Sequence, residues 1–163
     1  MSVLVAAASR YGATAEIADA IGEGLERAGL EVTVASVDDV PSADGYDAVV
    51  LGSAVYAGRW LKAARKFVKR NRSALSATRV WLFSSGPIGD PPKPDGEEAV
   101  DVTAIIEATE PEEHRILAGK LDKDQLTFGE RAIVVAVRSP EGDFRDWDEI
   151  AAWAHQIAGT LQP

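Results

Sequence analysis

Cysteine is absent from this chain of 163 residues, and histidine occurs only as His114 and His155. The absence of thiols excludes disulfide bonds, thiolate zinc sites, iron–sulfur clusters and cysteine nucleophiles. Because two histidines far apart in sequence offer little for an imidazole-bound metal, we expect no metal site. No apolar run approaches the ~18 residues that a membrane-spanning helix needs.

Basic residues are also scarce, with 17 lysines and arginines against 26 acidic residues and a net charge of −9. Phosphate attraction needs a basic surface, so this balance predicts no nucleic-acid partner. The opening apolar run, Met1–Ala8, is too short for a signal peptide and lacks its basic flank. We therefore expect a cytoplasmic protein.

The composition is that of a folded chain, with 46% hydrophobic and 26% charged residues. This predicts one globular domain over residues 1–163. The charge is unevenly spread, because Arg59–Arg79 holds eight basic residues and no acidic one. Such a run is either a solvated helix face or a patch for an anion, a lipid or a partner protein.

Hydrophobic periodicity alternates between strand and helix along the chain. Continuous apolar strands separated by amphipathic helices predict an open parallel sheet with helices on both faces. Residues 131–138 are rich in branched side chains and remain open between strand and helix. The expected strands are 2–8, 31–37, 46–53, 78–84 and 113–121, and the expected helices are 14–28, 61–75, 101–108 and 146–161.

The loop after the first strand, Ser9–Thr14, carries the best candidate for a binding site. It leads into a helix, so backbone N–H groups and the helix dipole point at whatever lies above it. Gly12 allows close backbone approach and Arg10 adds a cation, which suits one phosphate monoester. Dinucleotide and nucleotide-triphosphate glycine motifs are absent from the sequence. The alternative is that Ser9 and Thr14 only cap the helix.

Two further loops follow strands whose ends should lie at the same edge of the sheet. The segment Ser53–Trp60 brings two aromatic residues that could stack on a flat ligand, although Trp60 alone fits better as the first buried residue of the next helix. The segment Ser84–Asp90 offers hydroxyl and backbone groups, or is an ordinary proline-rich turn. Together the three loops indicate a flat, phosphorylated cofactor.

The first loop, Ser-Arg-Tyr-Gly-Ala-Thr, resembles the FMN-phosphate loop of flavodoxins. Its Arg-x-Gly-x-Thr form is most similar to the menaquinone-dependent protoporphyrinogen dehydrogenases, a flavodoxin-like family. Residues 46–53, 56–60, 117–121 and 146–154 resemble further segments of that family in the same order. The resemblance implies an α/β flavodoxin-like fold with a five-stranded parallel sheet, order 2-1-3-4-5, and helices on both faces.

The resemblance also implies non-covalent FMN and a set of cofactor-binding residues. No side chain stands out as a catalytic acid or base, and both histidines are expected to be structural. The implied phosphate loop is Ser9, Arg10, Tyr11, Gly12, Ala13 and Thr14, and the residues implied beside the flavin ring are Ser53, Ala54, Val55, Tyr56, Ala57, Gly58, Arg59, Ser84, Ser85, Gly86, Pro87 and Gly89.

Three functions are compatible with this site. The first is an FMN oxidoreductase of the quinone-dependent protoporphyrinogen dehydrogenase type, with a porphyrinogen or quinone as small-molecule partner. The second is a flavodoxin-type electron carrier with a protein redox partner, and the third is a flavin-free binding module. The first is favoured, and Arg59–Arg72 then predicts peripheral contact with the inner face of the membrane.

Overall fold

The computed structural model describes residues 1–56, 58–86, 102–121, 142–143 and 145–162. Five parallel strands form its central sheet in the order β2-β1-β3-β5-β6. This confirms the predicted order 2-1-3-4-5, because the extra short strand β4 shifts the later numbers. The five strands are β1 (Ser2–Ala8), β2 (Glu31–Ser36), β3 (Ala48–Tyr56), β5 (Arg79–Ser85) and β6 (Glu113–Leu117).

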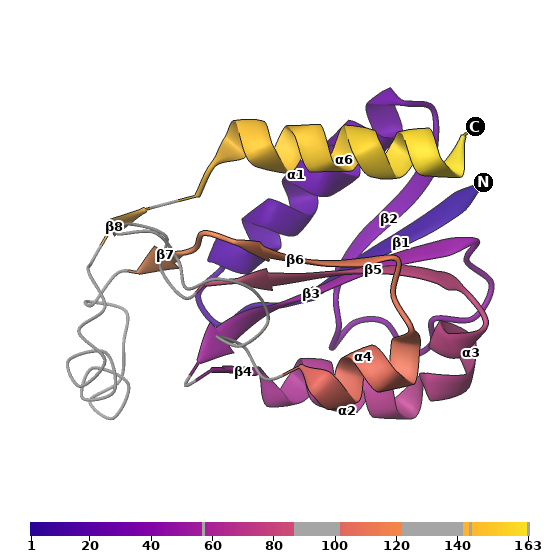
Figure 1. Cartoon of the computed structure of the whole chain (residues 1–163), viewed down its shortest axis with the longest axis horizontal. Coiled ribbons are helices and arrows are strands. Elements are labelled where there is room, and N and C mark those ends of the chain that lie inside the picture. The colour runs from indigo at the N-terminus through magenta and orange to yellow at the C-terminus, as the bar shows by residue number, and fades with distance from the viewer. Residues whose placement is uncertain (57, 87–101, 122–141, 144, 163) are drawn as a thin grey trace.

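Helices cover both faces of the sheet, as Figure 1 shows. On one face α1 (Ala13–Arg27) lies beside α6 (Trp147–Leu161). The other face carries α2 (Lys62–Arg70), α3 (Arg72–Ser76) and α4 (Thr103–Thr109). The arrangement follows from the strands, which are apolar on both sides and must be covered twice.

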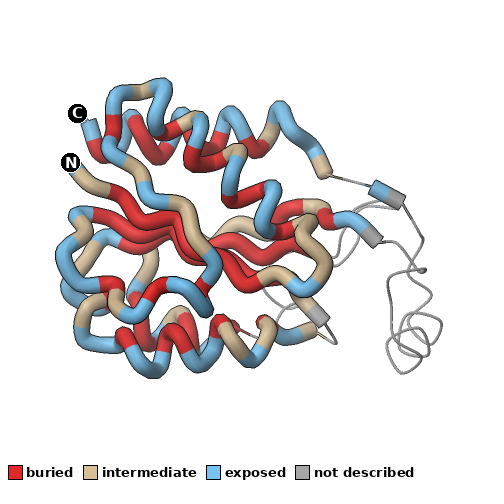
Figure 2. Tube along the Cα trace, turned by 180° about the vertical axis from the view of Figure 1, so that it is seen from behind, coloured by how far each residue is buried: buried red, intermediate tan, exposed pale blue. Residues whose placement is uncertain are grey.

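The core is divided into two clusters by the sheet. Val3 and Val5 point toward the α1–α6 layer, whereas Leu4 and Ala6 point toward the layer of α2, α3 and α4. Figure 2 shows the strands as a buried layer between the helices. Along each strand, the parity of a residue number therefore determines which layer its side chain enters.

The expected helix over 61–75 is interrupted in the structure. Leu61 is the residue before α2, and Asn71 separates α2 from α3. The buried Asn71 side chain donates from Nδ2 to the Phe67 carbonyl (3.0 Å) and accepts from the Ala43 amide at Oδ1 (2.9 Å). This side chain therefore competes with the regular helix, a tendency that asparagine has through its local hydrogen bonds.

The expected strand over 113–121 also proves to be two strands. β6 ends at Leu117, and β7 (Lys120–Leu121) pairs in antiparallel fashion with β8 (Gly142–Asp143). A side chain at Gly119 would lie 3.1 Å from the amide nitrogen of Gly86, so the backbones approach closely where the strand breaks. Periodicity alone could not reveal this contact.

A short hairpin was not predicted at all. β4 (Arg59–Trp60) folds back on the end of β3, with Val55 opposite Trp60. The segment 131–138, left open between strand and helix, lies outside the described residues. Within the described part of the chain, no helix is both long and apolar enough to cross a membrane.

Candidate cofactor site

The carboxyl ends of β1, β3, β5 and β6 meet at one edge of the sheet. The strand register places Ala8 opposite Ser53, and Ser85 opposite both Ala54 and Leu117. The three loops singled out from the sequence therefore start side by side. Of the predicted site residues, Ala57, Pro87 and Gly89 lie outside the described residues, and only the backbone of Tyr56 is described.

The first loop delivers the N-terminus of α1 to this edge. Gly12 precedes the helix with φ of 92°, a left-handed conformation that favours glycine. In the part of the chain that the structure describes, a Cβ at Gly12 would meet nothing within 4 Å, so the backbone there is open to a ligand. An α-helix leaves its first N–H groups without intrahelical acceptors, and here they are those of Ala13, Thr14 and Ala15.

The capping alternative for Ser9 and Thr14 does not fit this geometry. The Ser9 hydroxyl accepts a hydrogen bond from the Gly12 amide at 3.0 Å. This bond stabilises the turn of the loop and does not cap α1. Thr14 is buried in the first turn, and among the described residues no side chain caps α1. Arg10 is exposed, with its guanidinium 6.0 Å from the centre of the Tyr11 ring.

In the second loop, internal hydrogen bonds hold the backbone in place. The buried Ser53 hydroxyl donates to the Ala54 carbonyl (2.8 Å) and accepts from the Leu61 amide (3.0 Å). Trp60 is buried, but in β4 rather than in the next helix, and its indole Nε1 donates to the Ser84 hydroxyl at 2.7 Å. The Ser53 contact ties the end of β3 to the start of α2, and the Trp60 contact ties β4 to β5.

Ser84 continues this chain of contacts to the edge strand. Its Oγ lies 2.7 Å from Nε2 of His114 on β6. Ser84 has the parity of Val80 and Leu82, whose side chains enter the layer of α2, α3 and α4. Its hydroxyl is therefore engaged inside the fold, and strand parity is the signal that could have indicated this.

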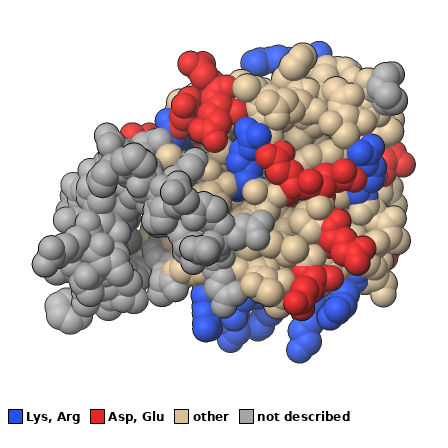
Figure 3. Space-filling model, viewed as in Figure 1, with Lys and Arg blue, Asp and Glu red and all other residues tan. Residues whose placement is uncertain are grey.

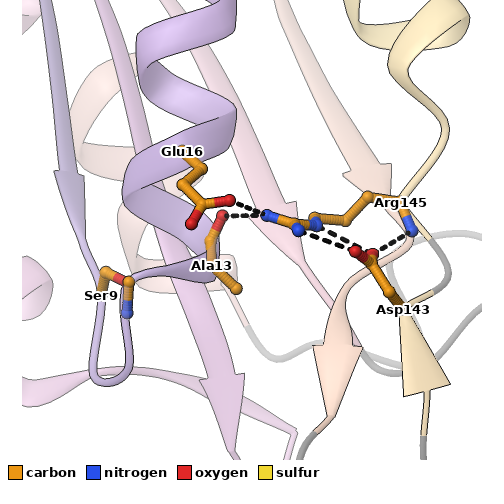
Figure 4. Close-up of polar contacts among 6 residues, drawn as sticks. Ser9, Ala13, Glu16, Asp143 and Arg145 are labelled. Carbon is orange, nitrogen blue, oxygen red and sulfur yellow. Dashed lines mark hydrogen bonds and ion pairs between the residues drawn. The ribbon is translucent and has the colours of Figure 1, made fainter.

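A contact that sequence reasoning missed joins the first turn of α1 to the segment before α6. Arg145 donates from Nη1 to Glu16 Oε2 (2.8 Å) and to the Ala13 carbonyl (3.3 Å), as Figure 4 shows. Its Nε and Nη2 donate to the two carboxylate oxygens of Asp143 at 2.9 and 2.7 Å. No local pattern could have revealed it, because 129 residues separate Arg145 from Glu16.

The electrostatics of this cluster follow from the same contacts. Hydrogen bonding to Asp143 raises the pKa of Arg145 above its usual range, against the opposing effect of burial, and Glu16 adds to the rise. The hydrogen bonds and charge of Arg145 lower the pKa of the Asp143 carboxyl. Both groups are therefore charged at neutral pH.

A strongly basic surface lies on the outer side of α2. We call the four exposed residues Lys62, Arg65, Lys66 and Lys69 the cationic face. The buried side of α2 consists of Ala64, Phe67 and Val68, which pack against the sheet. Figure 3 shows basic side chains gathered along the lower edge of the molecule, where Figure 1 places α2 and α3. The run of basic residues in the sequence is thus the exposed side of an amphipathic helix.

The fold and this edge define a doubly wound α/β protein, the class that binds ligands beyond the carboxyl ends of its parallel strands. The sequence profile of the family described as "Flavodoxin domain" matches residues 4–148. The chain therefore belongs to the flavodoxin domain family.

Individual relatives are more distant. The quinone-dependent protoporphyrinogen IX dehydrogenase of Escherichia coli K12 is 23% identical, over 97% of this chain and 95% of its own length. Among solved structures, a flavodoxin from the domain Archaea has 20% identity and a TM-score of 0.65, with both chains fully covered. Oxidised Flavodoxin 1 from Bacillus cereus has 14% identity and the same TM-score, over 98% of both chains.

Proposed function

We propose that the chain binds FMN non-covalently at the carboxyl edge of the sheet and works as a redox protein. The observation that carries this proposal is the first loop, where the left-handed Gly12 leads into α1 and no atom of the described residues lies within 4 Å of a side chain placed at Gly12. Helix N-termini of this kind bind phosphate through their free N–H groups and the helix dipole. Membership of the flavodoxin domain family supports the same ligand.

The residues present fit FMN better than a dinucleotide. One glycine and one helix N-terminus provide for a single phosphate, whereas a pyrophosphate calls for the three-glycine pattern that this sequence lacks. Gly58 and Gly86, with φ of 76° and 88°, lie in the two loops proposed to flank the flavin ring. Gly86 is held there by its amide, which donates to the Leu117 carbonyl at 2.9 Å.

Bound FMN would supply the redox chemistry, while the protein provides binding and orientation. The Ser9–Thr14 loop and α1 would hold the phosphate, with the exposed Arg10 as an added cation. The contacts of Ser53 and Trp60 would fix the second loop beside the ring. Arg10 and the α1 dipole would give FMN its advantage over riboflavin.

The first test concerns the phosphate. The double substitution Arg10→Ala with Thr14→Ala should weaken FMN binding, since charge-assisted hydrogen bonds contribute roughly 1.5–3 kcal/mol each. Riboflavin, which has no phosphate, is the matched control ligand and should lose little affinity. Equal losses for both ligands, or FAD recovered from heat-treated protein by chromatography, would contradict the proposal.

For the reaction, we propose an oxidoreductase of the quinone-dependent protoporphyrinogen dehydrogenase type. Support comes from the relative in Escherichia coli, which aligns over nearly the whole length of both chains. The cationic face supports it too, because positive potential attracts a carboxylated porphyrinogen. FMN-loaded protein should oxidise protoporphyrinogen with a menaquinone analogue as acceptor, and Lys62→Glu with Lys66→Glu or high salt should slow the reaction.

A flavodoxin-type electron carrier is the second candidate. The net charge of −9 favours it, because an acidic surface steers a carrier to basic partners. Quinone-dependent oxidation at the background rate, together with rapid electron exchange with a flavoprotein reductase, would select the carrier. Turnover that depends on both porphyrinogen and quinone would select the enzyme.

A further inference from the structure

Arg145 forms a nearly buried cationic contact at the first turn of α1. Only 5% of its side chain is exposed, although its partners Glu16 and Asp143 are 59% and 41% exposed. The guanidinium also lies 4.6 Å from the centre of the Trp147 ring. Two carboxylates and one ring therefore fix this cation against the helix.

The position of Glu16 poses an electrostatic problem for the proposed phosphate site. Glu16 is the acidic residue in the first turn of α1, and its amide donates to the Gly12 carbonyl at 3.0 Å. The backbone of Glu16 thus lies about one helical turn, ~5.4 Å along the axis, from Gly12, at the end of the helix whose N–H groups would hold the phosphate. A carboxylate in this first turn repels a phosphate dianion.

Arg145 offsets this repulsion directly. Its Nη1 reaches Glu16 Oε2 at 2.8 Å and, through the Ala13 carbonyl, touches the helix turn itself. Asp143 binds the opposite side of the guanidinium through two oxygens, which fixes the direction of Nη1. Bidentate contacts of this type set orientation as well as energy.

We propose that Arg145 is a positioning residue for FMN, which pairs with Glu16 and lowers its repulsion so that the N-terminus of α1 accepts the phosphate. This inference rests on the proposed function, since it concerns the same phosphate site. It assigns the specificity for a phosphorylated flavin partly to a residue 129 positions away from Glu16. Arg145 need not touch the phosphate, because its effect passes through Glu16.

The experiment compares affinities for FMN and riboflavin, measured by flavin fluorescence quenching in low salt. Arg145→Met should weaken FMN binding about tenfold relative to riboflavin, the effect of one charge near a helix terminus. Adding Glu16→Gln to that variant should recover most of the loss, because the repelling carboxylate is gone. High salt should shrink the difference.

Two further variants keep the test decisive. Glu16→Gln alone, which does not depend on the folding of an Arg145 variant, should leave the FMN preference equal to or greater than that of the wild type. Arg27→Met is the matched control, because Arg27 is an exposed arginine paired with Glu23 in the last turn of the same helix. It should leave both affinities unchanged.

The outcomes separate this inference from the proposed function. Equal losses of FMN and riboflavin in Arg145→Met, no recovery by Glu16→Gln in that background, or a reduced FMN preference in Glu16→Gln alone would overturn the inference. If the wild type prefers FMN and Arg145→Met keeps that preference, only the inference fails. If the wild type shows no preference for FMN over riboflavin, the proposed function is contradicted, and so is the inference that depends on it.

Discussion

Trp60, Ser84 and His114 form a chain of polar contacts in the layer between the sheet and the helices α2, α3 and α4. The Ser84 hydroxyl is its centre, because it accepts from the Trp60 indole and lies 2.7 Å from His114 Nε2. Buried polar groups are costly to leave without partners. This chain therefore links the hairpin at the end of β3 to the edge strand β6.

Replacing Ser84 by alanine should destabilise the protein by about 1–3 kcal/mol, because the buried indole N–H loses its acceptor. Urea unfolding at neutral pH measures the change. The control is Ser76→Ala, which removes an exposed hydroxyl bonded to the Ser73 carbonyl and should cost no more than ~0.5 kcal/mol. Similar costs for both variants would argue against the role assigned to Ser84.

Asp143 predicts a pH dependence of stability. Its pKa in the folded protein lies below the ordinary value of 3.8, chiefly because Arg145 hydrogen-bonds the carboxylate. A lowered pKa contributes stability that is fully present above about pH 4 and is lost as the pH falls through the folded value. Asp143→Asn should therefore be less stable than wild type at pH 7, with the gap closing below pH 4 in urea titrations; a gap that stays constant would contradict this origin.

Among the elements, α1 and α6 differ in how their glycines are used. In α1, a side chain at Gly22 would clash with Val34 of β2, and one at Gly24 would lie 2.7 Å from Ala154 of α6. Glycine therefore lets α1 approach both the sheet and its neighbouring helix. In α6, a side chain at Gly159 would have no atom of the described residues within 4 Å.

The same substitution should consequently have opposite effects in the two helices. Gly159→Ala should stabilise the protein by about 0.5–1 kcal/mol, because alanine restricts the unfolded chain and favours helix. Gly22→Ala should destabilise it, since overpacking typically costs about 1–3 kcal/mol. Thermal unfolding of the two variants gives the comparison, and shifts in the same direction would be inconsistent with this packing.

Local patterns determined most elements, and tertiary contacts determined the exceptions. The two helical layers and the meeting of three loops follow from periodicity and the rules for parallel sheets, whereas the strand order is implied by the resemblance to flavodoxins. The breaks at Asn71 and Gly119 depend on Ala43 and Gly86, which are remote in sequence. Arg145 escaped prediction for the same reason, because a solvated arginine and a buried one look alike in sequence.

At the scale of the whole molecule, the charge is divided. The net charge is −9, yet α2 exposes lysines and arginines and has no acidic residue. On the opposite side of the sheet, α1 carries exposed acidic residues together with Arg27. The molecule thus presents two faces of different potential to an approaching surface.

We expect the cationic face to bind anionic lipid. FMN-loaded protein should sediment with phosphatidylserine-containing vesicles at low salt, and Lys66→Glu should reduce binding, since each basic residue contributes about 1 kcal/mol near such a surface. Arg27→Glu, on the far face, makes the same change in net charge and should have much less effect. Equal losses for the two variants would indicate a response to net charge alone.

The pairing of α1 with α6 has a consequence for the order in which the protein matures during synthesis. The helices α2, α3 and α4 have all been synthesised once the chain has passed Thr109, whereas the core beside α1 also needs Trp153 and Ile157 of α6. At about 5–20 residues per second, the ribosome needs several seconds to supply them. During that interval α1 alone covers this apolar face of the nascent sheet. Transiently exposed apolar surface of this kind is what chaperones bind.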